Sequence, residues 1–173
     1  MTKHLVLDSV FVRDFSKLEL LPSFLNLSCE MQTSSTAYSC SEWPGDSITY
    51  DGPVCSKIYV ETLSNDELDK AFRLGVAFPG LAYEDYTVLY IAHRDGLELV
   101  TGDSRVRRVA ISMKLEVYDY LWVFCEMVKA GQLALDDAIL KYYELTKSVN
   151  KLAIWKEPEI ALREAYSDYK QIA

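Results

Sequence analysis

The sequence lacks paired cysteines and long hydrophobic runs. Its four cysteines are scattered without a CxxC pair, so we expect reduced thiols rather than a disulfide framework. No apolar run approaches the roughly 18 uncharged residues that a membrane-spanning helix needs. The first residues also lack the apolar segment and the cleavage site of a signal peptide. These absences predict a cytoplasmic protein with no membrane partner.

Two phosphate-binding motifs and an excess of basic charge are missing as well. Neither GxGxxG nor GxxxxGK[ST] occurs in the chain, which argues against a doubly wound nucleotide or phosphate binder. The 18 Lys and Arg residues face 26 Asp and Glu residues, for a formal net charge of −8. This charge opposes non-specific attraction to a phosphate backbone. A nucleic-acid site would therefore need a local basic patch or bound cations.

The residues that are present have the composition of a packed globular domain. Of the 173 residues, 50% are hydrophobic and 25% are charged. A chain of this length buries most of its unfolded surface, so we expect folding without a metal or disulfide scaffold.

Short apolar runs alternate with helical periodicity over the first three quarters of the chain. Strands are predicted at 5–7, 29–33, 57–60, 97–101 and 115–118. Strands separated by helices indicate an α/β fold, with a central parallel sheet flanked by helices on both faces. A surface loop is expected at 43–53. After residue 136 only helices are predicted, and we treat 148–173 as a helical tail packed on the domain formed by 1–147.

Two acids stand directly after predicted strands. Asp8 follows the first strand, and Asp103 follows the fourth through the single residue Gly102. Ligands of open parallel sheets bind outside the carboxyl ends of the strands, so both acids should lie at the same edge. One isolated acid here is most simply a helix cap. Two acids at matched positions favour a shared site.

The segments around these acids resemble a known family, the PIN-domain ribonucleases, in the form similar to VapC-type toxins. The resemblance rests on LVLDS at 5–9, LAYEDYTVLYIA at 81–92 and LELVTGDSRVRRVA at 97–110. It extends from about Leu5 to Lys147. It implies a PIN-like fold and a metal-dependent endoribonuclease acting on RNA, as the toxin of a toxin–antitoxin pair. It also implies a homodimer and an antitoxin protein as partner.

In such proteins four acids converge on a divalent metal ion. Three of the positions correspond here to Asp8, Asp85 and Asp103, and the fourth is assigned to Glu42, at the end of the helix after the second strand. Glu61, which follows the third strand, is the alternative. Mg²⁺ and Mn²⁺ prefer hard oxygen ligands, and the bound ion activates water for attack on a phosphodiester.

Substrate contacts are expected from residues beside these acids. Ser9 and Ser104 follow Asp8 and Asp103, and Arg105 and Arg108 belong to the densest basic cluster of the chain. A solvated helix face is the alternative explanation of that cluster.

A different class of function stays open: a catalytically weak or inactive PIN-like module that binds a protein or RNA. The acidic net charge and Val10, where the family usually has a small polar residue, favour it. For either function we expect an exposed apolar surface that binds another chain. The helices between residues 10 and 27 carry more apolar side chains than one face against a sheet absorbs, and the tail offers a second stripe.

Overall fold

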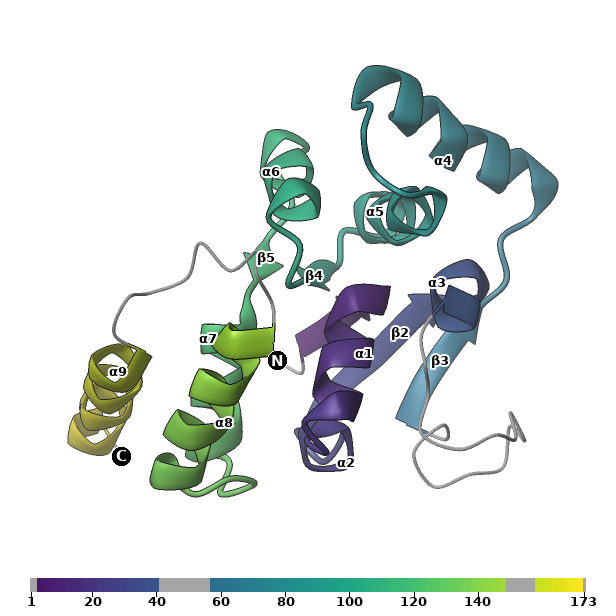
Figure 1. Cartoon of the computed structure of the whole chain (residues 1–173). Coiled ribbons are helices and arrows are strands. Elements are labelled where there is room, and N and C mark those ends of the chain that lie inside the picture. The colour runs from purple at the N-terminus through teal and green to yellow at the C-terminus, as the bar shows by residue number, and fades with distance from the viewer. Residues whose placement is uncertain (1–2, 41–56, 149–157, 173) are drawn as a thin grey trace.

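The computed structural model describes residues 3–40, 57–148 and 158–172 (Figure 1). Its centre is a five-stranded sheet in the order β3-β2-β1-β4-β5, and each neighbouring pair is parallel. The strands are β1 (Lys3–Leu7), β2 (Cys29–Ser34), β3 (Ile58–Glu61), β4 (Glu98–Val100) and β5 (Val117–Tyr118). The predicted α/β class, with a parallel sheet flanked by helices, is confirmed.

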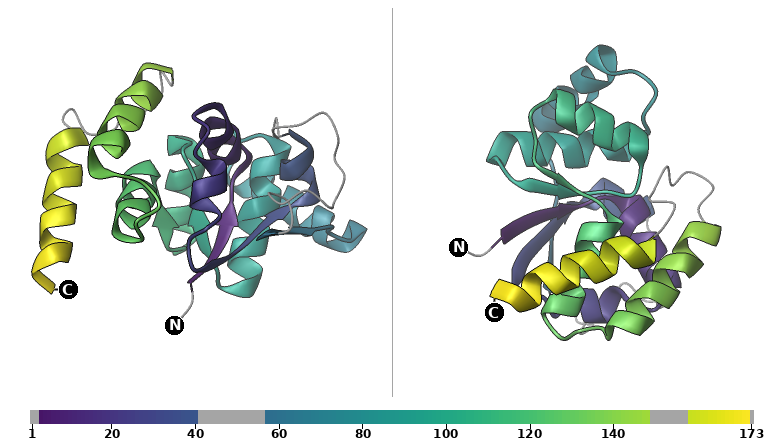
Figure 2. Two further views of the ribbon diagram at one scale, coloured as in Figure 1. Left: turned by 90° about the horizontal axis from the view of Figure 1, so that it is seen from below. Right: turned by 90° about the vertical axis from the view of Figure 1, so that its left-hand side faces the viewer.

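Helices cover both faces of this sheet, as the right-hand view of Figure 2 makes clear. On one face lie α1 (Ser9–Lys17), α2 (Leu21–Phe24), α7 (Tyr120–Lys129), α8 (Leu135–Ser148) and α9 (Pro158–Ile172). The other face carries α3 (Ser35–Cys40), α4 (Asn65–Ala77), α5 (Tyr83–Asp95) and α6 (Ser104–Ser112). No helix in the described ranges is long and apolar enough to cross a membrane.

The central strand β1 explains why two separate hydrophobic clusters form. Side chains alternate across a strand, so Leu5 and Leu7 point to one face of the sheet and Val6 points to the other. All three are fully buried. A short apolar run in the sequence therefore reflects a strand that is covered on both sides.

Side chains at the helix ends set where several helices begin and stop. Ser64 and Glu67 form a reciprocal capping box at the start of α4. Gly96 takes a left-handed conformation (φ 66°) and ends α5, with Leu97 between it and β4. Asp8, Asp103 and Asp119 each follow a strand and cap the next helix. The sheet edge where the strands end is thus also where helices α1, α6 and α7 begin.

The exposed apolar surface expected between residues 10 and 27 is absent, and that prediction is wrong. Every large apolar side chain counted for it is at most 5% exposed: Phe11, Phe15, Leu18, Leu20, Leu21, Phe24 and Leu25. The reason is α7, whose side chains pack against α1 and α2 on the same face of the sheet. Its Tyr120 and Phe124 rings lie 6.0 and 5.5 Å from the ring of Phe15.

The C-terminal helix α9 packs against α7 and α8 at one end of the molecule (Figure 1). Leu162 is 1% exposed and belongs to the same hydrophobic cluster as α1, while Tyr166 packs against that cluster. Ile160 of the same helix is 50% exposed, so part of the apolar stripe predicted in the tail is at the surface. Other exposed large apolar side chains in the described parts of the chain include Phe72 and Val76 on α4.

Candidate active site

Asp8 is the most deeply buried acid at the carboxyl edge of the sheet. It is 0% exposed, and its backbone N–H still pairs with the carbonyl of Val100 on β4. One carboxyl oxygen accepts the N–H of Val10 at 3.4 Å, and the other accepts the hydroxyl of Thr101 at 2.6 Å. Burial raises the pKa of Asp8 to about 6, and the charge of Asp103 adds to this.

Asp103 reaches the same edge from the neighbouring strand β4. Its Oδ1 accepts the N–H of Arg105 at 2.7 Å, as an N-cap of α6. Its own N–H donates to Thr101 Oγ1 at 3.0 Å. The Thr101 hydroxyl therefore contacts both the carboxyl of Asp8 and the backbone of Asp103. Asp8 and Asp103 can therefore each cap a helix and also belong to one shared site.

Asp85 joins them from the first turn of α5. It is 4% exposed, and its Oδ2 accepts the N–H of Ala82 at 2.9 Å. Burial raises the pKa of Asp85 to about 7, and the charge of Asp8 is the next cause, with Glu84 and Asp103 adding to it. The charges of Asp8 and Asp103 both raise the pKa of Asp85, so the three predicted acids lie close enough to interact electrostatically.

The three acids do not form a closed metal cluster. In residues 3–40, 57–148 and 158–172, no group of three His, Cys, Asp or Glu side chains lies close enough to hold one ion. Instead, the Arg105 guanidinium binds Asp103, with Nη2 at 3.1 Å from Oδ2 and Nε at 3.4 Å from Oδ1. The donors are nonetheless hard carboxyl oxygens that repel one another, which is the chemistry that suits Mg²⁺ or Mn²⁺.

The alternative fourth acid, Glu61, lies at a different place. Its Oε1 accepts from Arg94 Nη2 at 2.7 Å. Arg94 is near the C-terminal end of α5, about 13 Å along the helix from Asp85 at 1.5 Å per residue. Arg94 also binds Glu67 and Asp95, so Glu61 belongs to a separate ion-pair network.

Glu42, the preferred fourth acid, lies outside the described residues. The last residue of α3 before it, Cys40, is close to the site. Burial raises the pKa of Cys40, and the charges of Glu84 and Asp85 contribute. The C-terminal end of α3 therefore approaches the start of α5, where Asp85 is.

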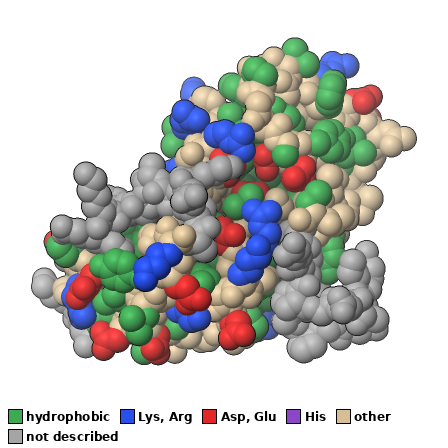
Figure 3. Space-filling model, viewed as in Figure 1, with side chains coloured by type: hydrophobic (Ala, Val, Ile, Leu, Met, Phe, Trp, Pro, Cys, Tyr) green, Lys and Arg blue, Asp and Glu red, His purple; other side chains and the backbone are tan. Residues whose placement is uncertain are grey.

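The predicted substrate contacts surround the acids in different ways. Ser9 is buried, with its hydroxyl 3.4 Å from Asp8 Oδ1, whereas Ser104 is exposed at the start of α6. Arg105 and Arg108 are both exposed on α6. Figure 3 shows acidic side chains between α5 and α6, with Lys and Arg side chains beside them over α6 and α1.

Sequence reasoning missed two groups that hold this edge together. Thr101 is one, and the only hint in the sequence is a hydroxyl residue two positions before Asp103. The second is the buried pair of Tyr120 and Asp14, whose Oη and Oδ2 atoms are 2.5 Å apart. Nothing in the sequence pattern connects these two residues, because they are 106 positions apart.

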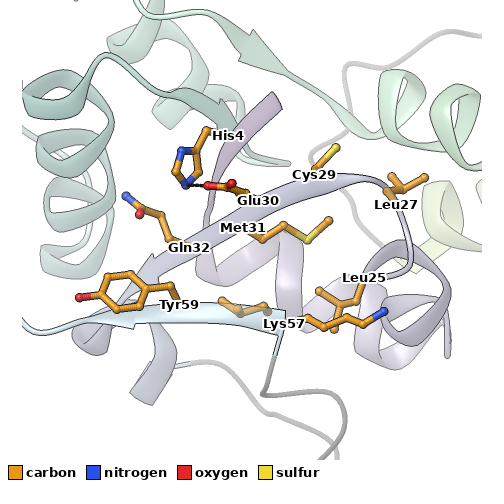
Figure 4. Close-up of a pocket in the computed structure, with 10 residues that line it drawn as sticks. His4, Leu25, Leu27, Cys29, Glu30, Met31, Gln32, Lys57 and Tyr59 are labelled. Atoms are coloured by element: carbon orange, nitrogen blue, oxygen red, sulfur yellow. Dashed lines mark ion pairs between the residues drawn. The ribbon is translucent and has the colours of Figure 1, made fainter. Parts of the chain in front are cut away.

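A cavity of about 710 Å³ lies away from the acids, around the first halves of β1 and β2 and the start of β3 (Figure 4). His4 and Glu30 form an ion pair there, with 3.1 Å between Nε2 and Oε2. None of the predicted site residues in the described part of the chain lines this cavity.

No protein-family model matches this chain, and no curated protein matches it. The assignment of the acids therefore depends on their geometry and on the resemblance of the short segments around them.

Proposed function

We propose that the protein is a metal-dependent endoribonuclease of the PIN type, which hydrolyses RNA with Mg²⁺ or Mn²⁺. The observation that carries this proposal is the meeting of three buried carboxyl groups from separate parts of the chain. Asp8 comes from β1 and α1, Asp85 from α5, and Asp103 from β4 and α6. Burial and the charges of the neighbouring acids raise the pKa values of Asp8 and Asp85, and a divalent cation would relieve that repulsion.

The contacts of each residue support a specific role in the proposed RNA cleavage. Asp8, Asp85 and Asp103 would hold the ion, and Thr101 keeps Asp8 and Asp103 in register through its hydroxyl. A bound divalent ion supplies positive charge for phosphate oxygens and lowers the pKa of a water ligand. Arg105, on the rim of the site, has a guanidinium able to exchange Asp103 for a phosphate of the substrate.

The first prediction tests this proposal through Asp8→Asn. Asparagine is as good an N-cap as aspartate, so α1 should keep its start while the site loses one charge. We expect RNA cleavage with Mn²⁺ or Mg²⁺ to fall by at least about 100-fold. The assay is cleavage of a labelled RNA, compared with the wild type at equal concentrations of folded protein.

Glu61→Gln is the matched control, because it also removes one charge but from the Arg94 network. It should keep wild-type cleavage. Equal cleavage by wild type and Asp8→Asn would contradict the proposal.

The second candidate function is a PIN-like module that binds a partner without cutting RNA. The observation favouring it is the Arg105 guanidinium, which already neutralises Asp103 where a metal ion would bind. Unaltered RNA after binding, in the presence of either metal, would identify this function. The remaining parts of the proposal, a cytoplasmic toxin with an antitoxin and a homodimer, rest on the resemblance alone.

A further inference from the structure

Tyr120 makes a buried hydrogen bond at the first turn of α7. The residue is 0% exposed, and its Oη donates to Oδ2 of Asp14, on α1, at 2.5 Å. Burial and the neighbouring Asp14 raise the pKa of Tyr120 well above its ordinary value, so the hydroxyl stays protonated and remains a donor. Asp14 itself is 8% exposed and has little water to bind instead.

The same ring lies against the backbone that carries Asp103. A Cβ atom added at Gly102 would be 2.0 Å from Tyr120 Oη and 2.2 Å from Cζ. Such distances are impossible between non-bonded atoms, so glycine is needed at 102 for space. The Tyr120 ring edge therefore occupies the place of a side chain next to Asp103.

Two phenylalanines of α1 hold the ring in this position. The Tyr120 ring stacks on Phe15 at 6.0 Å with planes 8° apart, and on Phe11 at 5.8 Å with planes 25° apart. Tyr120 is thus in contact with the helix that Asp8 caps and with the turn that Asp103 follows. It links the two elements that bring these acids together.

We propose that Tyr120 and Asp14 are a positioning pair, whose hydrogen bond fixes α1 against the turn at Gly102 and so sets the spacing of Asp8 and Asp103. This inference rests on the proposed function, since it concerns the same two acids. Neither residue touches the substrate in this role. Stacking holds the ring against α1 without a preferred atom-to-atom contact, whereas the hydrogen bond joins its hydroxyl to one defined atom of the helix.

Tyr142 supplies a comparison within the same core. It is also 0% exposed, on α8, but its hydroxyl has no hydrogen-bond partner among the residues that the structure describes. Tyr142 therefore gives a matched control, because removing its hydroxyl breaks no hydrogen bond to α1 or to the turn at Gly102 within the described residues.

The second prediction tests the pair with Tyr120→Phe. We expect the variant to fold and to bind Mn²⁺ about tenfold more weakly, as when an outer-shell hydrogen bond is lost. Titration of Mn²⁺ followed by electron paramagnetic resonance measures this. Tyr142→Phe removes the same atom from an equally buried tyrosine and should leave Mn²⁺ binding unchanged.

A second measurement needs no metal. Hydrogen exchange of the backbone amides of Asp103 and Arg105, which are bonded to Thr101 and Asp103, reports how firmly the turn is held. We expect Tyr120→Phe to speed it about fivefold or more relative to amides of α8, which serve as the reference for global unfolding.

Variants of Asp14 separate positioning from general packing. Asp14→Asn keeps an oxygen acceptor for the Tyr120 hydroxyl and should stay within about twofold of wild type in both measurements. Asp14→Leu removes the acceptor and should reproduce the effect of Tyr120→Phe. If Tyr120→Phe does not fold, the comparison of these two variants decides the matter.

The outcomes distinguish the two proposals. Wild-type protein that binds no Mn²⁺ would overturn the proposed function, while hydrogen exchange would still test the positioning pair. Tyr120→Phe and Asp14→Leu with wild-type exchange at Asp103 and Arg105 would overturn the pair and leave the proposed function standing.

Discussion

At the scale of single residues, the site is defined by carboxyl groups that are buried with too little positive charge around them. Asp8 and Asp85 have pKa values of about 6 and about 7, against 3.8 for the free side chains. Near neutral pH the folded protein therefore holds protons that the unfolded chain would release. Stability should change with pH and with divalent cations for the same reason.

The third prediction is that metal-free protein becomes less stable as the pH rises. Between about pH 4 and pH 7 the folded state binds more protons than the unfolded state, because both pKa values are raised on folding, so the free energy of unfolding falls across this window. At about 1.4 kcal/mol per pKa unit, the loss attributable to the two acids is on the order of 4 kcal/mol between pH 5 and pH 8. Thermal unfolding in a chelating buffer at pH 5 and pH 8 measures it.

The control for this dependence is Asp85→Asn, which removes one of the two raised carboxyls and should flatten the slope. Millimolar Mn²⁺ at pH 8 should restore the melting temperature of the wild type, because an ion that binds only the folded state stabilises it. A wild-type slope that survives unchanged in Asp85→Asn would contradict the assignment of the slope to this site.

The fourth prediction concerns Arg105, which binds both oxygens of Asp103. Arg105→Gln should tighten Mn²⁺ binding by about three- to tenfold, because the guanidinium no longer competes with the ion for the carboxylate. The same variant should weaken RNA binding. Calorimetric titration measures the first effect, and filter binding of RNA the second.

Arg108→Gln is the matched control, with the same loss of charge from the same helix. Arg108 is exposed, and no carboxylate partner of it is present in the described ranges. It should leave Mn²⁺ affinity unchanged. Equal effects of the two substitutions would mean that only net charge matters at this site.

At the scale of elements, the turn at Gly102 packs directly against the Tyr120 ring of α7. The fifth prediction is that Gly102→Ala destabilises the protein by about 2 kcal/mol or more, because the added methyl group would overlap the Tyr120 ring. Urea denaturation gives the free energy. A stability equal to that of the wild type would mean that the ring moves aside without loss.

Local sequence patterns predicted the elements that local physics controls. Strand β1 was visible as an apolar run because both its faces are covered, and Asp8 and Asp103 could be placed at one edge because parallel strands end together. The capping box of Ser64 and Glu67 likewise depends only on local spacing, because the two residues are three positions apart. These features depend on residues that are near neighbours in the chain.

Long-range packing could not be predicted in the same way. The sequence shows more apolar side chains on α1 and α2 than the sheet alone can bury, and it does not show that α7 covers them. Asp14 and Tyr120 were missed for a related reason, because their bond joins positions 106 residues apart. Thr101 was missed because its bond to Asp8 spans 93 positions. Glu61 followed a strand as Asp8 does, but the position of Arg94 gives it another role.

At the scale of the whole molecule, charge is distributed unevenly. The net charge is −8, yet basic side chains on α6 lie beside the acids (Figure 3). Arg94 joins the end of β3 to α4 and α5 through Glu61, Glu67 and Asp95, away from the acid site. Under the proposed function, RNA would bind at this local basic surface, while the net negative charge opposes binding elsewhere.

The sheet order β3-β2-β1-β4-β5 also bears on how the protein is made. The strand synthesised first is central, and its neighbour β4, with Asp103, is among the last strands to be added. The bond between Asp14 and Tyr120 closes a loop of 106 residues. A nascent chain therefore carries Asp8 long before it has the groups that complete the site. The packing that positions Asp8 and Asp103 is therefore complete only after α7 has left the ribosome.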